Sequence, residues 1–410
     1  MLGRRWGGVY DSASTMFFLR GRTCSCVRGC LSPRTFAQIF GDSRSEPQQW
    51  LQSARSGGSR TLQMLGLFST AQAGYIAISI CHLVADEWTT RNGGRLSIIT
   101  PAELESALTG NPEALEVHLT LVERDVPIDG HLVKIHCHCL SVDGNGRVQP
   151  HRLAEFMRNA VVDYAIPRSK LADAKARDNR FNSTEAVAEL IERAKRSFTD
   201  LANTGEGGEM LLFLLAERFL KLPQILCKMD LKTDTRMHYH GADGVYAGVT
   251  SEGTLKLYWG ESKVYADASA AIRDCLNSLS PFLLEPEHEE AGRERDLMLL
   301  SDKADLRNPA LTDALKKYFD KSSVMSKRVQ YCGVALVGFD APFYPKGEAK
   351  AVAEEIVEAS RTALRGWSNR IGERLKLEKL DQIEVELFCI PLPSAEGFRA
   401  AFLKAMGIKE

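Results

Sequence analysis

The sequence predicts an α/β protein in which a mixed sheet is flanked by helices. Two observations carry this prediction. Short segments with alternating or continuous apolar residues are typical of strands, and longer segments repeat apolar residues at helical spacing. The two kinds of segment interleave from about residue 115 to the C-terminus, which favours a sheet packed between helices. The chain has 410 residues, 44% of them apolar, so it has room for two or three domains with sizeable cores.

Residues 111–200 are predicted to form a region of strands and helices that docks a partner or DNA. β-Branched and polar residues alternate in 115–123 and 131–142, as expected for two strands joined by a turn. Apolar residues recur at helical spacing in 153–164 and 184–201, which predicts two helices.

Residues 201–410 are predicted to form the main core. A helix, four strands and a helix are expected first, at 207–222, 225–231, 236–240, 243–249, 255–263 and 266–281. A charged region follows at 285–327, with helical patterning in 311–319. The last elements are a strand, a long helix, a strand and a closing helix, at 329–338, 346–375, 383–390 and 394–405. The segment 329–338 is almost entirely apolar, which indicates a central strand buried on both faces.

Residues 1–110 are predicted to be an extension that is partly disordered. Residues 1–60 contain nine Arg and nine Ser but no Lys and only three acids, and 43–60 lacks a periodic apolar pattern. Three interpretations stay open: a nucleic-acid-binding tail, a targeting peptide, or a segment upstream of the true start of the protein. The segment CSCVRGC lacks a second ligand pair, so a zinc site there is not expected.

Charge and cysteine content narrow the function classes. The net charge is −1, so a nucleic-acid partner must be held by a local basic patch rather than by the overall field. Ten scattered Cys do not form a disulfide framework, which favours a reducing cytoplasm. The most apolar stretch, 62–84, is interrupted by polar residues, and no membrane span is expected.

Four residues of the main core suggest chemistry on a phosphate. Glu209 lies in the first turn of a predicted helix, Asp243 lies between Gly241 and Gly244, which let the backbone bend, and Glu261 and Lys263 end an apolar strand. Because side chains alternate along a strand, Glu261 and Lys263 share a face and Ser262 lies on the other. Carboxylates bind hard divalent cations, which stabilise charge on a phosphate, and a lysine offsets further negative charge.

The order and spacing of these residues resemble the PD-(D/E)XK nuclease superfamily. The resemblance implies that Asp243 and Glu261 bind Mg²⁺, or Mn²⁺ in its place, and that Lys263 orients the attacking water. It also implies that Glu209 corresponds to an assisting acid on the first helix, which helps to bind a metal ion or tunes the site. The Pro that gives the superfamily its name is replaced by Ala242, a common departure.

Three longer motifs resemble a narrower family, the HamA nuclease subunits of the Hachiman anti-phage defence system. They are HGADGV at 240–245, GESK at 260–263 and IPLPSAEGFRAAF at 390–402. The resemblance covers roughly 115–410 and implies a superfamily 2 helicase partner (HamB-like) that senses aberrant or phage DNA. It also implies that the nuclease degrades DNA, and we expect its activity to be restrained until the partner releases it.

Several other residues have less specific signals. His238 and His240 are possible auxiliary contacts to a phosphate, or strand histidines with hydrogen-bond partners. In the run 136–139, alternation places two His on one face and two Cys on the other, so strand packing is expected rather than zinc binding. Glu217 is expected on the solvent side of its helix or paired with Arg218.

Two basic stretches, 168–196 and 316–328, are candidates for DNA phosphate contacts or for solvated helix faces. The possible DNA-binding residues are Arg168, Lys170, Lys195, Arg196, Lys327 and Arg328.

The functional hypothesis is a metal-dependent DNA endonuclease. Two alternatives stay open. One is a catalytically inactive nuclease fold that scaffolds a helicase on DNA, against which the presence of all four site residues argues. The other is an RNA-cleaving nuclease, which no residue excludes.

Overall fold

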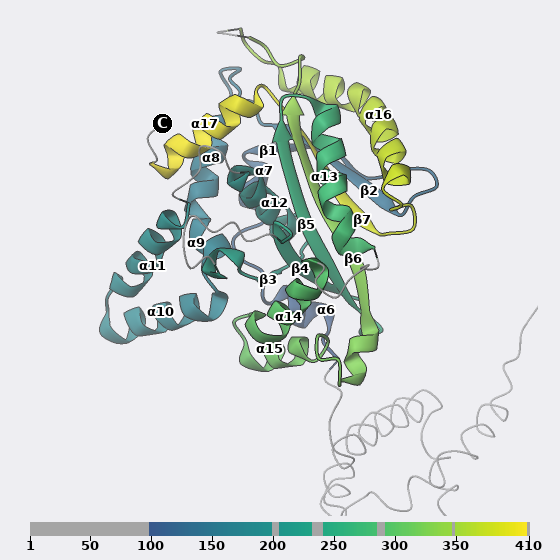
Figure 1. Ribbon diagram of the computed structural model, residues 1–410. Coiled ribbons are helices and arrows are strands. Elements are labelled where there is room, and N and C mark those ends of the chain that lie inside the picture. The colour runs from purple at the N-terminus through teal and green to yellow at the C-terminus, as the bar shows by residue number, and fades with distance from the viewer. Residues whose placement is uncertain (1–97, 199–204, 232–240, 285–291, 347–348, 408–410) are drawn as a thin grey trace, which may run out of the picture. The chain divides into compact units, whose positions relative to one another are not determined.

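A computed structural model describes residues 98–198, 205–231, 241–284, 292–346 and 349–407 (Figure 1). Its centre is one seven-stranded mixed sheet with the order β1-β2-β7-β6-β5-β4-β3. The strands are β1 (Leu119–Pro127), β2 (Val133–Leu140), β3 (Gln224–Leu226), β4 (Gly244–Val249), β5 (Leu255–Tyr265), β6 (Val329–Asp340) and β7 (Val385–Leu392). The predicted fold class, a mixed sheet flanked by helices, is confirmed.

Strands β1 and β2 belong to the same sheet as the strands of the main core. β2 pairs in parallel with β7, for example His136 with Phe388, and β7 pairs in parallel with β6. One continuous set of buried residues extends from Ile99 to Met406. One β-sheet and its core thus extend across the predicted boundary at residue 200.

Helices cover both faces of the sheet. In Figure 1, α8 (Pro150–Asn159), α12 (Glu206–Arg218) and α17 (Ala395–Met406) lie on one face, and α13 (Ala268–Leu283) and α16 (Ala353–Leu377) lie on the other. The remaining helices are α6 (Pro101–Glu105), α7 (Glu113–Glu116), α9 (Val161–Ala165), α10 (Arg168–Phe181), α11 (Glu185–Arg196), α14 (Gly292–Lys303) and α15 (Pro309–Lys316). Two short 3₁₀ helices are η2 (Lys228–Leu231) and η3 (Val324–Arg328).

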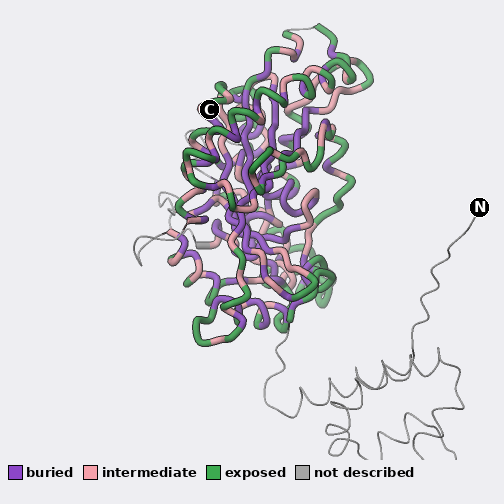
Figure 2. The backbone as a smooth tube through the Cα atoms, turned by 90° about the vertical axis from the view of Figure 1, so that its right-hand side faces the viewer, coloured by how far each residue is buried: buried purple, intermediate pink, exposed green. Residues whose placement is uncertain are grey.

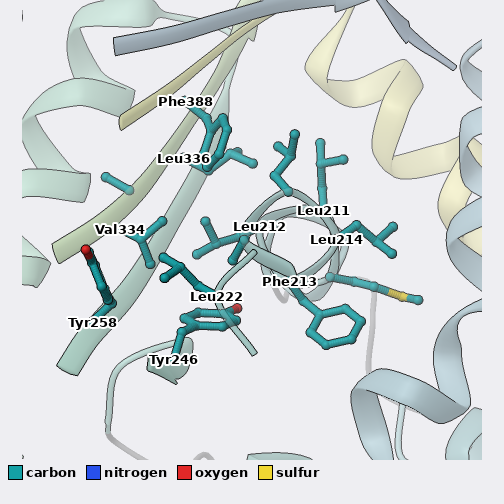
Figure 3. Close-up of a cluster of buried hydrophobic side chains, with 14 of the residues drawn as sticks. Leu211, Leu212, Phe213, Leu214, Leu222, Tyr246, Tyr258, Val334, Leu336 and Phe388 are labelled. Atoms are coloured by element: carbon teal, nitrogen blue, oxygen red, sulfur yellow. The ribbon is translucent and has the colours of Figure 1, made fainter. Parts of the chain in front are cut away.

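Helix α12 is buried around its whole circumference. Leu211, Leu212, Phe213 and Leu214 each have 1% exposure or less, and Figure 3 shows them projecting in different directions from the helix, with side chains of β6 and β7 on one side of it. A helix that is apolar on every side is stable only inside a core. Figure 2 shows where burial lies in the described chain. Buried residues run through the middle, and exposed residues lie on the outer helices.

Most predicted elements are found, with ends displaced by a few residues. The predicted helix 153–164 is two helices, α8 and α9, because the backbone at Ala160 leaves helical geometry (φ −96°, ψ 6°). The predicted helix 346–375 begins later, at Ala353. The predicted strand 236–240 lies outside the described residues. No helix in the described part of the chain is long and apolar enough to span a membrane.

Candidate active site at the open edge of β5

The candidate site lies where strand β5 extends beyond its neighbour β4. Gly244, the first residue of β4, pairs with Gly260, and among the described residues 261–265 pair only with β6 on the other side. Both glycines are required by the ring of Tyr246: a Cβ at Gly244 would lie 2.5 Å from the Tyr246 hydroxyl oxygen, and one at Gly260 would lie 2.9 Å from the ring. Within the described ranges, β5 therefore has an unpaired stretch at 261–265 on this side, called the open edge below, above a packed base.

Asp243 is held at this open edge by Ser262. The Asp243 backbone N–H donates to the Gly260 carbonyl at 2.8 Å. The Asp243 carboxylate then accepts two hydrogen bonds from Ser262, one from the backbone N–H and one from Oγ, both at 2.8 Å. The free edge of β5 therefore supplies a backbone donor that orients the carboxylate.

Glu261 and Lys263 share one face of β5, as predicted, and form an ion pair. This face is covered by α13, where the Cys275 thiol lies 3.4 Å from the Glu261 carbonyl oxygen. Glu261 is 5% exposed. Burial, and then the nearby negative charge of Asp243, raise the pKa of Glu261 to about 7, although Lys263 and Lys228 act in the opposite direction.

Lys263 remains a cation at neutral pH. Burial alone would lower the pKa of Lys263, but the carboxylates of Glu261 and Asp243 outweigh burial and raise the pKa above its ordinary value. An ammonium group with a raised pKa does not release its proton near pH 7. Lys263 is therefore suited to donating hydrogen bonds and to offsetting negative charge, and not to acting as a general base.

Glu209 approaches from the opposite face of the sheet. It lies on α12, whose Gly208 faces Ser262 and Val264, the β5 residues that alternate with Glu261 and Lys263. The hydroxyl of Tyr164, a residue of α9 with 2% exposure, donates to Glu209 Oε2 at 3.0 Å. The predicted region 111–200 thus contributes a side chain directly to the site.

A cavity of about 360 Å³ joins these parts. Glu209, Asp243 and Lys263 line it, and Glu261 is buried behind them. Its remaining walls come from the glycine-rich start of α12, the end of β5 and one side of α17. Three of the four predicted catalytic residues therefore share one cavity, and the fourth is ion-paired to one of them.

The predicted metal ligands are Glu209, Asp243 and Glu261. Their ligand atoms do not all lie within 4.8 Å of one another. Among the described residues, only Asp125, His136 and Glu386 bring three ligand atoms within 4.8 Å of one another. Glu209, Asp243 and Glu261 do not, because Glu209 starts from the other face of the sheet. Asp243 and Glu261 nevertheless fit a divalent cation, since each provides hard oxygen atoms and the negative charge of Asp243 raises the pKa of Glu261.

The trio Asp125, His136 and Glu386 is better explained by hydrogen bonding. The backbone N–H of Asp125 donates to His136 Nδ1 at 3.3 Å, and His136 Nε2 lies 2.6 Å from Glu386 Oε2. Both ring nitrogens are therefore engaged by protein groups. Lys134 also lies 3.8 Å from Glu386, where it offsets the charge.

Lys228 is a buried lysine near the site that was not predicted from the sequence. Lys228 in η2 is 8% exposed. Burial lowers the pKa of Lys228, while the negative charges of Asp296, Asp243, Glu209 and Glu261 act to raise it. The cluster of acids thus includes a second lysine, whose charged form is disfavoured by burial. The signal in the sequence is a lysine two residues after a short apolar segment.

Arg168 and Glu217 are not where the sequence suggested. Glu217 has 1% exposure and forms a buried ion pair with Arg168, which is 8% exposed. The Arg168 guanidinium also donates to the Gln224 carbonyl at 3.1 and 3.2 Å. The expected solvent position of Glu217 is wrong, and a phosphate contact by Arg168 does not fit its burial.

The other five predicted DNA contacts, Lys170, Lys195, Arg196, Lys327 and Arg328, retain at least partial exposure. Lys170 pairs with Asp230 at 2.8 Å and Lys195 with Glu192 at 2.9 Å. Surface ion pairs of this kind contribute only about 0–1 kcal/mol, so they do not prevent contacts to phosphates. The predicted auxiliary residues His238 and His240 lie outside the described residues.

The histidines and cysteines of β2 pack as predicted. His136 and His138 face Phe219, with ring centroids 5.2 and 4.8 Å apart, and Cys137 and Cys139 are buried. Strand alternation therefore explains this run without a zinc ion.

The fold and the site define an α/β protein with a mixed sheet, whose candidate active site combines carboxylates and a charged lysine at one strand edge. A family model described as HamA matches residues 116–406. The chain therefore belongs to the HamA family and is a Hachiman-associated defence protein. A search of curated proteins found no match to it.

Proposed function

We propose that the protein is a metal-dependent DNA endonuclease that acts as the effector of an anti-phage defence complex. The observation that carries the proposal is the arrangement of Asp243, Glu261 and Lys263 at the open edge of β5, next to a cavity that Glu209 also lines. Membership of the HamA family adds support, since nuclease activity is what its resemblance to PD-(D/E)XK enzymes implies.

The carboxylates of Asp243 and Glu261 would hold Mg²⁺ or Mn²⁺, with Glu209 assisting from the other side of the cavity. A divalent cation in this position supplies charge neutralisation at the scissile phosphate. Ser262 fixes the orientation of Asp243, and Tyr164 fixes that of Glu209. These contacts restrict the ligand oxygens before substrate binds, which is the main requirement for precise positioning.

Lys263 would act on the water and the phosphate. Its ammonium group donates hydrogen bonds that orient the attacking water and offsets the charge that develops on the phosphate oxygens. The water oxygen forms the new bond to phosphorus, and the bond to the leaving oxygen of the neighbouring nucleotide breaks. The water releases a proton to solvent in the cavity, and the leaving oxygen takes up a proton from the same solvent. Because Lys263 remains protonated near pH 7, it stabilises this charge and does not remove the proton from the water.

We further propose that a superfamily 2 helicase is the partner and licenses cleavage. A catalytically inactive scaffold is the alternative function, but the presence of two carboxylates and a lysine at one cavity supports a working site.

Cleavage assays on labelled substrates test the proposal. Duplex DNA, single-stranded DNA and RNA would be incubated side by side with the protein, with and without its helicase partner, in Mg²⁺ and in EDTA. We expect DNA cleavage that requires Mg²⁺ and is lost on Glu261→Ala. If no substrate is cleaved, the result supports the catalytically inactive scaffold. If RNA alone is cleaved, the protein is an RNA-cleaving nuclease and not a DNA endonuclease.

A further inference from the structure

The cavity at the open edge of β5 has a second wall with a different chemical character. One side of α17 forms this wall, through Phe398, Arg399, Phe402 and Leu403. Glu209 and Asp243 line the same cavity. An anionic substrate that approaches these acids needs a cation on its other side, and Arg399 is the positively charged residue that α17 contributes to the cavity.

The wall is rigid. Phe398 and Phe402 are each 2% exposed, and they pack against the start of α12 at Gly207, where an added Cβ would lie 3.2 Å from the Phe402 ring. Helix α17 begins at a hydrogen-bonded N-cap, since Ser394 Oγ accepts from the Gly397 N–H at 3.0 Å. Two buried aromatic anchors therefore fix the position from which the exposed Arg399 side chain extends.

Arg399 is also available for a ligand. Its side chain is exposed, and within the described ranges no hydrogen bond or ion pair joins it to another residue. This differs from Lys263, which pairs with Glu261 in the same site. A guanidinium group presents a planar set of donors that matches the oxygens of a phosphate. Arg399 can bind a phosphate without breaking a hydrogen bond to another described residue.

We propose that Arg399 binds a backbone phosphate of the nucleic-acid substrate and so positions the scissile phosphate beside Glu209 and Asp243. This inference rests on the proposed function and assigns substrate binding to α17, through Arg399. Arg399 acts in binding, while Asp243, Glu261 and Lys263 act on the reacting atoms.

The test uses the full-length protein and a short fluorescein-labelled DNA duplex. Binding is measured by anisotropy in EDTA over a series of NaCl concentrations, for the wild type and for Arg399→Gln, Arg399→Lys and Lys404→Gln. Lys404 is the matched control, because it is an exposed cation of the same helix that does not line the cavity. Cleavage by each variant is then measured with Mg²⁺, and thermal unfolding checks that each is folded.

We expect Arg399→Gln to raise Kd about tenfold, as for loss of one charged hydrogen-bonded contact. The dependence of log Kd on log salt should fall by about 0.9, the loss of one phosphate contact. KM should rise more than kcat falls. Arg399→Lys should restore the salt dependence, and Lys404→Gln should leave it as in the wild type.

An Arg399→Gln protein with the Kd and salt dependence of the wild type would overturn the inference, as would a wild type that binds no DNA. Failure of the proposed function is a separate result: a wild type that binds DNA but does not cleave it with Mg²⁺. Because binding is measured in EDTA, the role of Arg399 is decided in either case.

Discussion

The carboxylate of Asp243 accepts two hydrogen bonds from Ser262, one from the backbone N–H and one from the hydroxyl, each 2.8 Å long. The residue between Glu261 and Lys263 thus orients the acid contributed by the neighbouring strand. Ser262 has 4% exposure, so this arrangement is shielded from solvent. The three consecutive residues 261–263 therefore all serve the site. Glu261 and Lys263 project from one face of β5, and Ser262 orients Asp243.

Substitution Ser262→Ala should lower DNA cleavage while leaving the fold intact. The backbone hydrogen bond to Asp243 remains, but loss of the hydroxyl removes one charge-assisted bond worth about 1.5–3 kcal/mol, or roughly tenfold to a hundredfold in rate. Initial cleavage rates at saturating Mg²⁺ measure the effect. Ser301→Ala, which removes an exposed hydroxyl bonded to the Met298 carbonyl, is the control. Equal rates for the two variants would remove Ser262 from the account.

The charge of Lys263 should matter far more than that of Lys256 on the same strand. Lys256 pairs with Glu384 at 2.8 Å, away from the cavity. Lys263→Met is expected to lower kcat by about 10²-fold or more, as for loss of a preorganised charge at a reacting centre. Lys256→Met should change kcat by less than about twofold. Similar losses in both variants would show that Lys263 acts on stability and not on chemistry.

Buried His138 should make the fold sensitive to acid. Burial first, and then the charges of His136 and Arg124, lower the pKa of His138 from 6.5 to about 3. Between pH 6.5 and 3, His138 is protonated in the unfolded chain but stays neutral in the folded chain. The free energy of unfolding therefore falls as the pH decreases from 6.5 towards 3. Linkage limits this loss to about 1.4 kcal/mol per pH unit for one group.

Urea unfolding of the wild type and His138→Leu at pH 6.5 and 4.5 measures the loss. The wild type should lose about 2 kcal/mol more than the variant over this interval. His151→Gln, a change at an exposed histidine, should behave like the wild type. An acid response of His138→Leu equal to that of the wild type would contradict the cause assigned here.

The buried pair of Arg168 and Glu217 should be structural. Glu217 also accepts from the Gln224 N–H at 2.8 Å and the Thr109 N–H at 3.0 Å, which joins the start of the described chain to α12. Glu217→Gln leaves a buried guanidinium without its counter-ion, and should cost about 3–5 kcal/mol of unfolding free energy. Lys195→Met, at an exposed pair, should cost less than about 1 kcal/mol.

Thermal or urea unfolding measures both variants, together with DNA binding of the folded fraction. A fully stable Arg168→Met or Glu217→Gln protein with weakened DNA binding would restore Arg168 to the phosphate contacts that the sequence suggested.

Local patterns were sufficient to predict most strands and helices and the shared face of Glu261 and Lys263, because alternation and helical spacing are set by neighbouring residues. They did not predict that β2 pairs with β7, since these strands are about 250 residues apart. For the same reason, Tyr164 and Arg399 were not recognised as parts of the site. The position of Glu217 was predictable in principle, because α12 has apolar residues on every side.

The central claim is that Asp243 and Glu261 hold one divalent cation beside Lys263. The most direct test is anomalous diffraction from crystals of the protein grown with Mn²⁺. The account predicts a peak within about 2.5 Å of carboxylate oxygens of both Asp243 and Glu261. A Mn²⁺ peak only at Asp125, His136 and Glu386, or a map in which Asp243 and Glu261 contact no ion at saturating Mn²⁺, would contradict it.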